Sequence, residues 1–120
     1  MQEFDKILAQ LVNNVDGARS AAVGGMDGLL IEQYPAQGAD LAALAAEQSN
    51  ILNSTRSAYA STLSSQGIRE VIVTTENLIG YTRVLSDELF CIIVMDVAGN
   101  IGKARVYTEQ AAPQILDALM

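Results

Sequence analysis

The sequence predicts an α+β (α/β) sandwich, a five-stranded antiparallel sheet with helices on both faces. Three observations predict it. Apolar residues recur at helical spacing in three stretches, five shorter segments are apolar or rich in β-branched residues, and tight turns join neighbouring strands. The expected element order is α-β-β-α-β-β-β-α. A chain of 120 residues suits one domain, so we expect a single domain over residues 1–120.

The first helix is expected from Glu3 onward, and two strands follow it. Apolar side chains recur at helical spacing up to Val15, and Asp16-Gly17 is typical of a helix end. Apolar segments at 21–25 and 29–34 flank Met26-Asp27-Gly28, whose Asp-Gly step tolerates the positive φ of a tight hairpin. These two segments are therefore expected to pair as antiparallel strands.

A long second helix is expected from Leu41 to about Ser65, because this stretch has neither glycine nor proline and Asp40 can cap its start. At 1.5 Å per residue, a helix of about 25 residues is roughly 37 Å long, whereas a typical strand spans about 17 to 20 Å. Many of its residues are alanine or serine, whose small side chains let helix backbones approach closely. Part of this helix is therefore expected to extend past its own sheet and to need another partner.

After Gly67 the chain becomes rich in β-branched residues, which indicates strands. The segment from Leu89 to Met95 is almost wholly apolar, as is typical of a central strand covered on both faces. A last helix is expected from about Asn100, with a kink at Pro113. The three strands expected in this part of the chain are 68–75, 78–85 and 88–96.

Composition excludes several classes of chemistry. The chain has 14 acidic and 7 basic residues, a net charge of −7, no histidine and one cysteine, Cys91. Without histidine, neither a Ser-His-Asp triad nor an imidazole metal site can form, and we expect no cofactor and no metal. The negative charge disfavours nucleic acids and anionic lipids as partners.

The sequence shows no export or membrane signal. The N-terminus does not resemble a signal peptide, and no apolar run approaches the roughly 20 residues of a membrane span. We therefore expect a cytoplasmic protein without membrane insertion.

No motif in the sequence supports catalysis. Residues 99–104 look briefly like a phosphate loop, but their glycines are too close together and Ala104 stands where a magnesium-binding hydroxyl is required. A helix start capped by Asn100 explains this segment more simply. Cys91 lies in an apolar strand, where burial would suppress thiol reactivity. We therefore expect a protein that is not an enzyme.

Three short segments, taken together and in their order along the chain, indicate a family resemblance. They are Val15-Asp16-Gly17-Ala18 after the first helix, Asp27-Gly28-Leu29-Leu30-Ile31 in the hairpin, and Asn100-Ile101-Gly102-Lys103-Ala104-Arg105 before the last helix. Together they resemble the roadblock/dynein light chain family, including its bacterial members similar to MglB, over nearly the whole chain. Profilin-like and longin-like domains have similar elements. The resemblance implies a non-enzymatic module that forms homodimers or heterodimers and serves small Ras-like GTPases or larger assemblies.

The resemblance also implies that the long helix and the following strand meet their counterparts across a two-fold axis. A Val- and Ile-rich edge strand without proline would be an aggregation hazard if left bare, which favours pairing between two chains. Arg69 and Glu70 could instead protect this edge with charge. An apolar stripe runs along the helix through Leu41, Leu44, Ala45, Gln48, Ile51, Leu52, Thr55, Tyr59 and Leu63. Core burial is the simpler interpretation of this stripe, whereas the polar atoms of Gln48, Thr55 and Tyr59 need partners and favour an interface. The expected dimer-interface residues are Gln48, Ile51, Leu52, Thr55, Tyr59, Val71, Ile72, Val73 and Thr74.

Regulation of a small Ras-like GTPase is the first functional hypothesis, whether by GTPase activation or as a scaffold. An arginine can stabilise charge on a transferring phosphoryl group, and Arg56 and Arg69 are candidate GTPase contacts, although a solvated charge or an ion pair is the simpler interpretation of either. The resemblance implies that MglB-like regulators reposition residues of the GTPase without donating such an arginine. The alternative hypothesis is a structural dimerisation adaptor that ignores the nucleotide. We expect a homodimer, and a heterodimer with a paralogue stays open.

Overall fold

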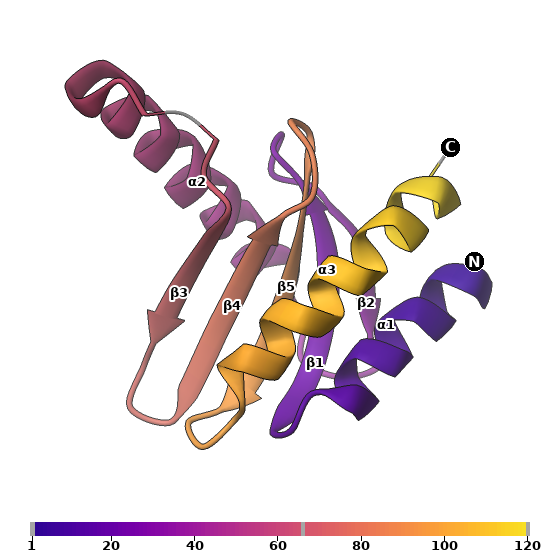
Figure 1. Ribbon diagram of the computed structural model, residues 1–120. Coiled ribbons are helices and arrows are strands. Elements are labelled where there is room, and N and C mark those ends of the chain that lie inside the picture. The colour runs from indigo at the N-terminus through magenta and orange to yellow at the C-terminus, as the bar shows by residue number, and fades with distance from the viewer. Residues whose placement is uncertain (1, 66, 120) are drawn as a thin grey trace.

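The computed structural model describes residues 2–65 and 67–119. Its helices are α1 (Gln2–Asn14), α2 (Ala42–Leu63) and α3 (Ile101–Ala118). Its strands are β1 (Ala18–Gly25), β2 (Leu30–Tyr34), β3 (Glu70–Thr74), β4 (Leu78–Val84) and β5 (Leu89–Asp96). The strands form one antiparallel sheet in the order β2-β1-β5-β4-β3 (Figure 1). The element order and the antiparallel sheet predicted from the sequence are confirmed.

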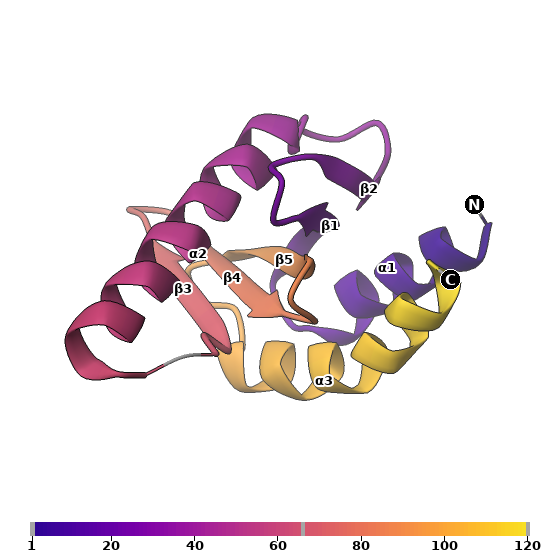
Figure 2. The same ribbon diagram turned by 90° about the horizontal axis from the view of Figure 1, so that it is seen from above.

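Helices cover both faces of this sheet, which confirms the predicted sandwich. α1 and α3 pack against each other on one face, and α2 lies on the other (Figure 2). Side chains alternate between the faces along each strand. On the central strand β5, Cys91 and Ile93 join the core beneath α1 and α3, whereas Phe90 and Ile92 join the core beneath α2. The strand predicted to be covered on both faces is therefore the middle one.

The two cores differ in extent. The core on the α1 and α3 face is the larger and takes Phe4 and Leu8 from α1, Tyr81 from β4 and Ile115 from α3. The core beneath α2 is smaller and centres on Leu52. Burying one such large apolar side chain stabilises the fold by about 1.5 to 3 kcal/mol, so the larger core contributes more of this stabilisation than the core beneath α2.

Local side-chain chemistry fixes the predicted turn and the predicted helix start. In the β1–β2 turn, Gly28 adopts a φ of +93° and the Asp27 carboxylate accepts the N–H of Leu29 at 3.1 Å. At α3, the Asn100 side chain accepts the N–H of Lys103 at 3.0 Å. Both contacts are short-range in sequence, which is why the sequence pattern indicates them.

Some element boundaries depart from the prediction. β1 begins at Ala18, three residues before the expected start, because Ala18 already pairs with Met95 of β5. α2 ends at Leu63, since Ser64 adopts a left-handed φ of 53°. α3 continues through Pro113 to Ala118. Within the described part of the chain, no helix combines the length and the hydrophobicity that crossing a bilayer requires.

Candidate protein interface at the β3 edge

Strand β3 forms one edge of the sheet, and alternate backbone groups along it face away from β4. Thr75 donates its N–H to the carbonyl of Leu78 at 2.8 Å, and Val84 donates to the carbonyl of Arg69 at 2.9 Å. In an antiparallel ladder, positions bonded to the neighbouring strand alternate with positions whose N–H and C=O point the other way. The outward-facing backbone groups are those of Glu70, Ile72 and Thr74.

This edge is regular and apolar. β3 pairs with β4 without a register shift from Glu70 to Thr74 and contains no proline. The side chains of Ile72 and Val73 are 37% and 40% exposed. An unprotected apolar edge is a template for pairing with another strand. The β3 edge therefore fits a β-strand of a partner chain.

A groove of about 200 Å³ lies beside the edge, between α2 and the β3–β4 half of the sheet. Val73 belongs to both the edge and the groove, so the two form one continuous surface, called here the β3 surface. Gly80 lies opposite Val73 and has no side chain to fill the floor. The apolar side chains that line the groove are Leu44, Ile51, Val73, Leu78, Ile92 and Val94.

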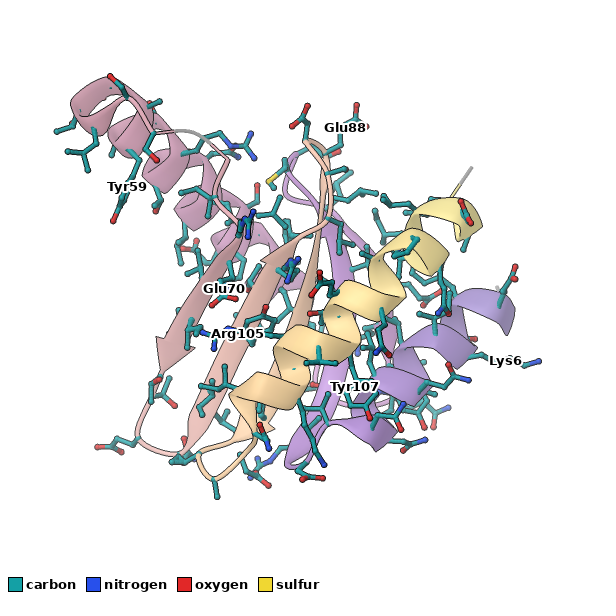
Figure 3. All side chains as sticks on the ribbon, viewed as in Figure 1. Lys6, Tyr59, Glu70, Glu88, Arg105 and Tyr107 are labelled. Atoms are coloured by element: carbon teal, nitrogen blue, oxygen red, sulfur yellow. The ribbon has the colours of Figure 1, made fainter. Side chains whose placement is uncertain are left out.

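The C-terminal end of α2 projects away from the sheet, which confirms that the long helix extends past it (Figure 1). Tyr59 lies on this projecting end (Figure 3). Its side chain is 47% exposed, and that of Leu63 is 65% exposed. Two large apolar side chains thus stand close to the end of a helix that its own protomer covers only in part.

Two of the predicted interface residues face inward. Leu52 is 1% exposed and belongs to the core beneath α2. Gln48 is 3% exposed, and its side-chain amide donates to the hydroxyl of the buried Thr82. Because this bond satisfies Gln48 within the protomer, its polarity is explained without a partner. We therefore remove both residues from the set that a second chain could touch.

The remaining predicted residues are distributed along the β3 surface and near it. Ile51 and Val73 line the groove together, although they come from different elements. Val71 is half-buried and packs against the core beneath α2. Thr55 is half-buried on α2, and Thr74 is exposed on β3.

The two predicted GTPase contacts lie on different elements. Arg56 is half-buried on α2, and the exposed Arg69 immediately precedes β3. Neither takes part in the salt bridges formed among residues 2–65 and 67–119, in which Arg19 pairs with Asp96, Lys103 with Asp16 and Arg105 with Glu70. Both guanidinium groups are thus available for an acidic partner.

Glu70 fastens β3 to α3 instead of guarding the edge with its charge. Arg105 donates to both Glu70 oxygens, through Nε at 3.0 Å and Nη2 at 2.8 Å, and the two side chains point toward each other (Figure 3). The Tyr81 hydroxyl also donates to Glu70, at 3.0 Å. The hydrogen bonds from Arg105 hold the pKa of the Glu70 carboxyl below its usual value. Burial raises the pKa of Tyr81.

Leu44, Leu78 and Val94 also line the groove, and the sequence pattern did not indicate them. Leu44 belongs to the apolar stripe of α2, which helical periodicity assigns to the core. The signal that could have indicated an opening is Gly80, because a glycine inside a strand often marks a place where another group approaches closely.

The chemistry of the β3 surface suits binding. Its outward backbone groups can pair with another strand, and its apolar side chains can be buried against a partner.

The other reactive groups among the described residues give no sign of a catalytic or metal site. Cys91 is fully buried, and burial raises the pKa of its thiol to about 12. In the part of the chain that the structure describes, no three Asp, Glu, Cys or His side chains gather around a potential metal site.

The fold and the free strand edge define the class of protein, a small α+β sandwich of the roadblock type. A Roadblock/LC7 domain model matches residues 4–94, and the chain belongs to this family. MglC from Myxococcus xanthus is 30% identical, with a TM-score of 0.63 over 94% of this chain and 96% of that one. No curated protein matches the sequence significantly.

Two further solved structures share the fold at lower identity. A Roadblock/LC7 domain from Streptomyces avermitilis is 17% identical, with a TM-score of 0.88 over 97% of both chains. An MglB with a tetrameric arrangement is 18% identical, with a TM-score of 0.82 over 95% of this chain and 85% of that one. These likenesses confirm the fold predicted from the sequence.

Proposed function

We propose that the protein is a non-enzymatic, dimeric regulator that binds a small Ras-like GTPase. The observation that carries the dimer is the β3 edge, where outward backbone groups and the exposed Ile72 and Val73 lie beside an apolar groove. Two β3 strands that pair across a two-fold axis would satisfy these backbone groups and cover the apolar side chains. The tetrameric arrangement of a related MglB supports assembly of this fold into oligomers.

The residues that we assign to the dimer contact are the accessible members of the predicted set. On β3 they are Val71, Ile72, Val73 and Thr74, and on α2 they are Ile51, Thr55 and Tyr59. Gln48 and Leu52 support this surface from inside by fixing α2 on the sheet. We propose a homodimer, and we propose that residues 1–120 act as one domain in the cytoplasm.

The family resemblance and two arginines outside the salt bridges support a GTPase partner. Arg56 and Arg69 carry positive charge in a chain of net charge −7, so they are among the side chains to which an acidic switch region would be attracted. A regulator acts by contacting one switch conformation more favourably than the other. The protein therefore biases the GTPase toward one nucleotide state, without a catalytic group or cofactor of its own.

Light scattering coupled to size exclusion tests this function. The purified chain should elute as a dimer and should co-elute with a small Ras-like GTPase of the same organism only when that GTPase carries a GTP analogue. Replacing Arg56 and Arg69 together by alanine should weaken the complex, and Lys6→Ala on α1 is the matched control. A dimer that binds both nucleotide states equally would indicate a structural adaptor instead. A stable monomer would refute the dimer.

A further inference from the structure

Two turns of the sheet lie side by side at one end and form a second groove. β1 pairs with β5, so Gly25 lies opposite Leu89, and Met26 donates its N–H to the carbonyl of Glu88 at 2.8 Å. The β1–β2 and β4–β5 turns are thereby held together around a depression of about 510 Å³, called here the turn groove. Glu88 marks this end of the sheet in Figure 3.

The turn groove presents apolar side chains where turns usually carry polar ones. Leu29 is 66% exposed and Ile31 is 37% exposed, and Leu30 and Leu89 line the groove with them. A single exposed leucine needs no explanation, but several that share one depression are typical of an interaction site.

The backbone beneath these side chains is fixed. The carbonyl of Met26 accepts hydrogen bonds from the Ser49 hydroxyl at 2.6 Å and from the Asn53 amide at 3.1 Å, both on α2. The Asp27 carboxylate accepts the N–H of Leu29 at 3.1 Å. Leu29 is therefore held outward by its backbone, and a partner would meet a surface that loses little conformational entropy on binding.

Acidic side chains border the apolar ones. Asp27, Asp87 and Glu88 line the turn groove, and among its described lining residues none is basic. In residues 2–65 and 67–119 no cluster of three such side chains is arranged to hold a metal ion, so these carboxylates do not converge on a cation site. A protein segment that combines apolar side chains with lysine or arginine matches both the surface and its charge.

We propose that the turn groove is a docking site for a basic, apolar segment of a partner protein. Apolar side chains of the segment would pack on Leu29 and Ile31, and its cations would lie beside Asp87 and Glu88. The groove lies at the ends of β1, β2 and β5, and β4 stands between β5 and the edge strand β3. None of the residues assigned to the dimer contact lines the turn groove, so this docking site can be tested separately from the proposed dimer.

Nuclear magnetic resonance on the full chain, with a defined peptide as probe, tests the proposal. An octapeptide of alternating lysine and leucine should shift the backbone amide signals of residues 26–31 and 86–89. Peptides of equal length with glutamate in place of lysine, or serine in place of leucine, should leave them unshifted. Leu29→Ser should weaken peptide binding at least about tenfold, as expected for loss of a central apolar contact.

Matched variants separate the contribution of the carboxylates from that of the apolar side chains. Asp87→Asn combined with Glu88→Gln should weaken binding and reduce its dependence on salt, because the attraction between charges is screened by ions. Val106→Ser removes another exposed apolar side chain, 51% exposed on α3, and should leave binding unchanged. A variant with an altered β3 edge, Thr74→Pro, should bind the peptide as the unaltered chain does.

Four outcomes would overturn the proposal. The lysine–leucine peptide could shift residues of the β3 surface instead, the glutamate peptide could bind equally well, or Leu29→Ser could have no effect. Concentration-dependent shifts of residues 26–31 without peptide, abolished by Leu29→Ser, would also overturn it, since the occupant would then be a second copy of this chain.

Discussion

The two edge strands of the sheet, β2 and β3, differ in how regularly they pair and in what covers them. At β2, the register with β1 shifts at Ile31, and α1 packs alongside the strand. The Glu32 carboxylate accepts the N–H of Gln33 at 3.3 Å. At β3, the pairing with β4 is regular, and the outward backbone groups of Ile72 and its alternate neighbours face no further strand of the sheet.

The β2 edge is also closed by a buried side chain. The Gln33 amide donates to the carbonyls of Pro35 and Ala39 at 3.1 and 2.8 Å, and its oxygen accepts the N–H of Leu41 at 3.0 Å. This side chain ties the end of β2 to the start of α2. The comparison teaches that a bulge and a local hydrogen-bond network close one edge within the protomer, whereas the other edge stays regular and apolar.

The largest expected effect is that of Thr74→Pro on the dimer. Proline removes an N–H that faces outward, so the bonds from β3 to β4 are kept while pairing with a second β3 is lost. Across the two symmetric copies we expect a loss of about 3 kcal/mol, a rise in Kd of more than about a hundredfold. Light scattering over a dilution series measures this. Thr74→Val keeps the N–H and serves as control, and a fully dimeric Thr74→Pro would show that the edge is not the interface.

At the β2 edge, Gln33→Leu should have the opposite effect: it should destabilise the fold and leave the dimer intact. This change leaves the N–H of Leu41 and two carbonyls without their partner in a site where Gln33 is 9% exposed, so we expect a loss of about 2 kcal/mol in the free energy of unfolding. Urea unfolding measures the loss, and Gln37→Leu in the exposed part of the same loop is the control. The dimer Kd should not change, and a weakened dimer would contradict the distinction between the edges.

Two isoleucines of equal exposure give a matched test. Ile72 on β3 and Ile31 on β2 are both 37% exposed. Ile72→Ser should raise the dimer Kd about tenfold, because an apolar side chain at a protein interface contributes on the order of 1 kcal/mol or more. Ile31→Ser should leave this Kd unchanged. Equal effects of the two substitutions in sedimentation equilibrium would mean that the dimer does not select β3.

The smallest effect is expected at the contact between β3 and α3. The pKa of Glu70 is lowered in the folded chain, chiefly by the hydrogen bonds from Arg105. A lowered folded-state pKa contributes stability above the usual carboxyl value and loses it as pH falls through the lowered pKa. Glu70→Gln should therefore cost less than about 1 kcal/mol near neutral pH, and the difference from the unaltered chain should vanish in strong acid.

Urea unfolding of both chains at neutral pH and at about pH 2 measures this difference, with Glu109→Gln on the exposed side of α3 as control. A difference that persists unchanged in acid would show that Glu70 stabilises by packing and not by its charge.

The sequence by itself determined the element order and the local signals, because these depend on residues close together in the chain. Helical and strand periodicity gave the sandwich, Asp27-Gly28 gave the hairpin turn, and Asn100 gave the start of α3. The length of α2 relative to a strand also predicted that the helix would extend past its sheet.

The strand after the long helix was already expected to be an edge strand, but only the tertiary structure decided that the β2 edge is closed and which polar groups face inward. Gln48 bonds to Thr82 across 34 positions of sequence, and Glu70 bonds to Arg105 across 35, distances at which no periodic pattern pairs residues. The groove beneath α2 likewise exists because one helix is positioned over Gly80 and its neighbours from other strands. Local propensity specifies which elements form, whereas the burial of side chains between distant elements specifies which surfaces remain for partners.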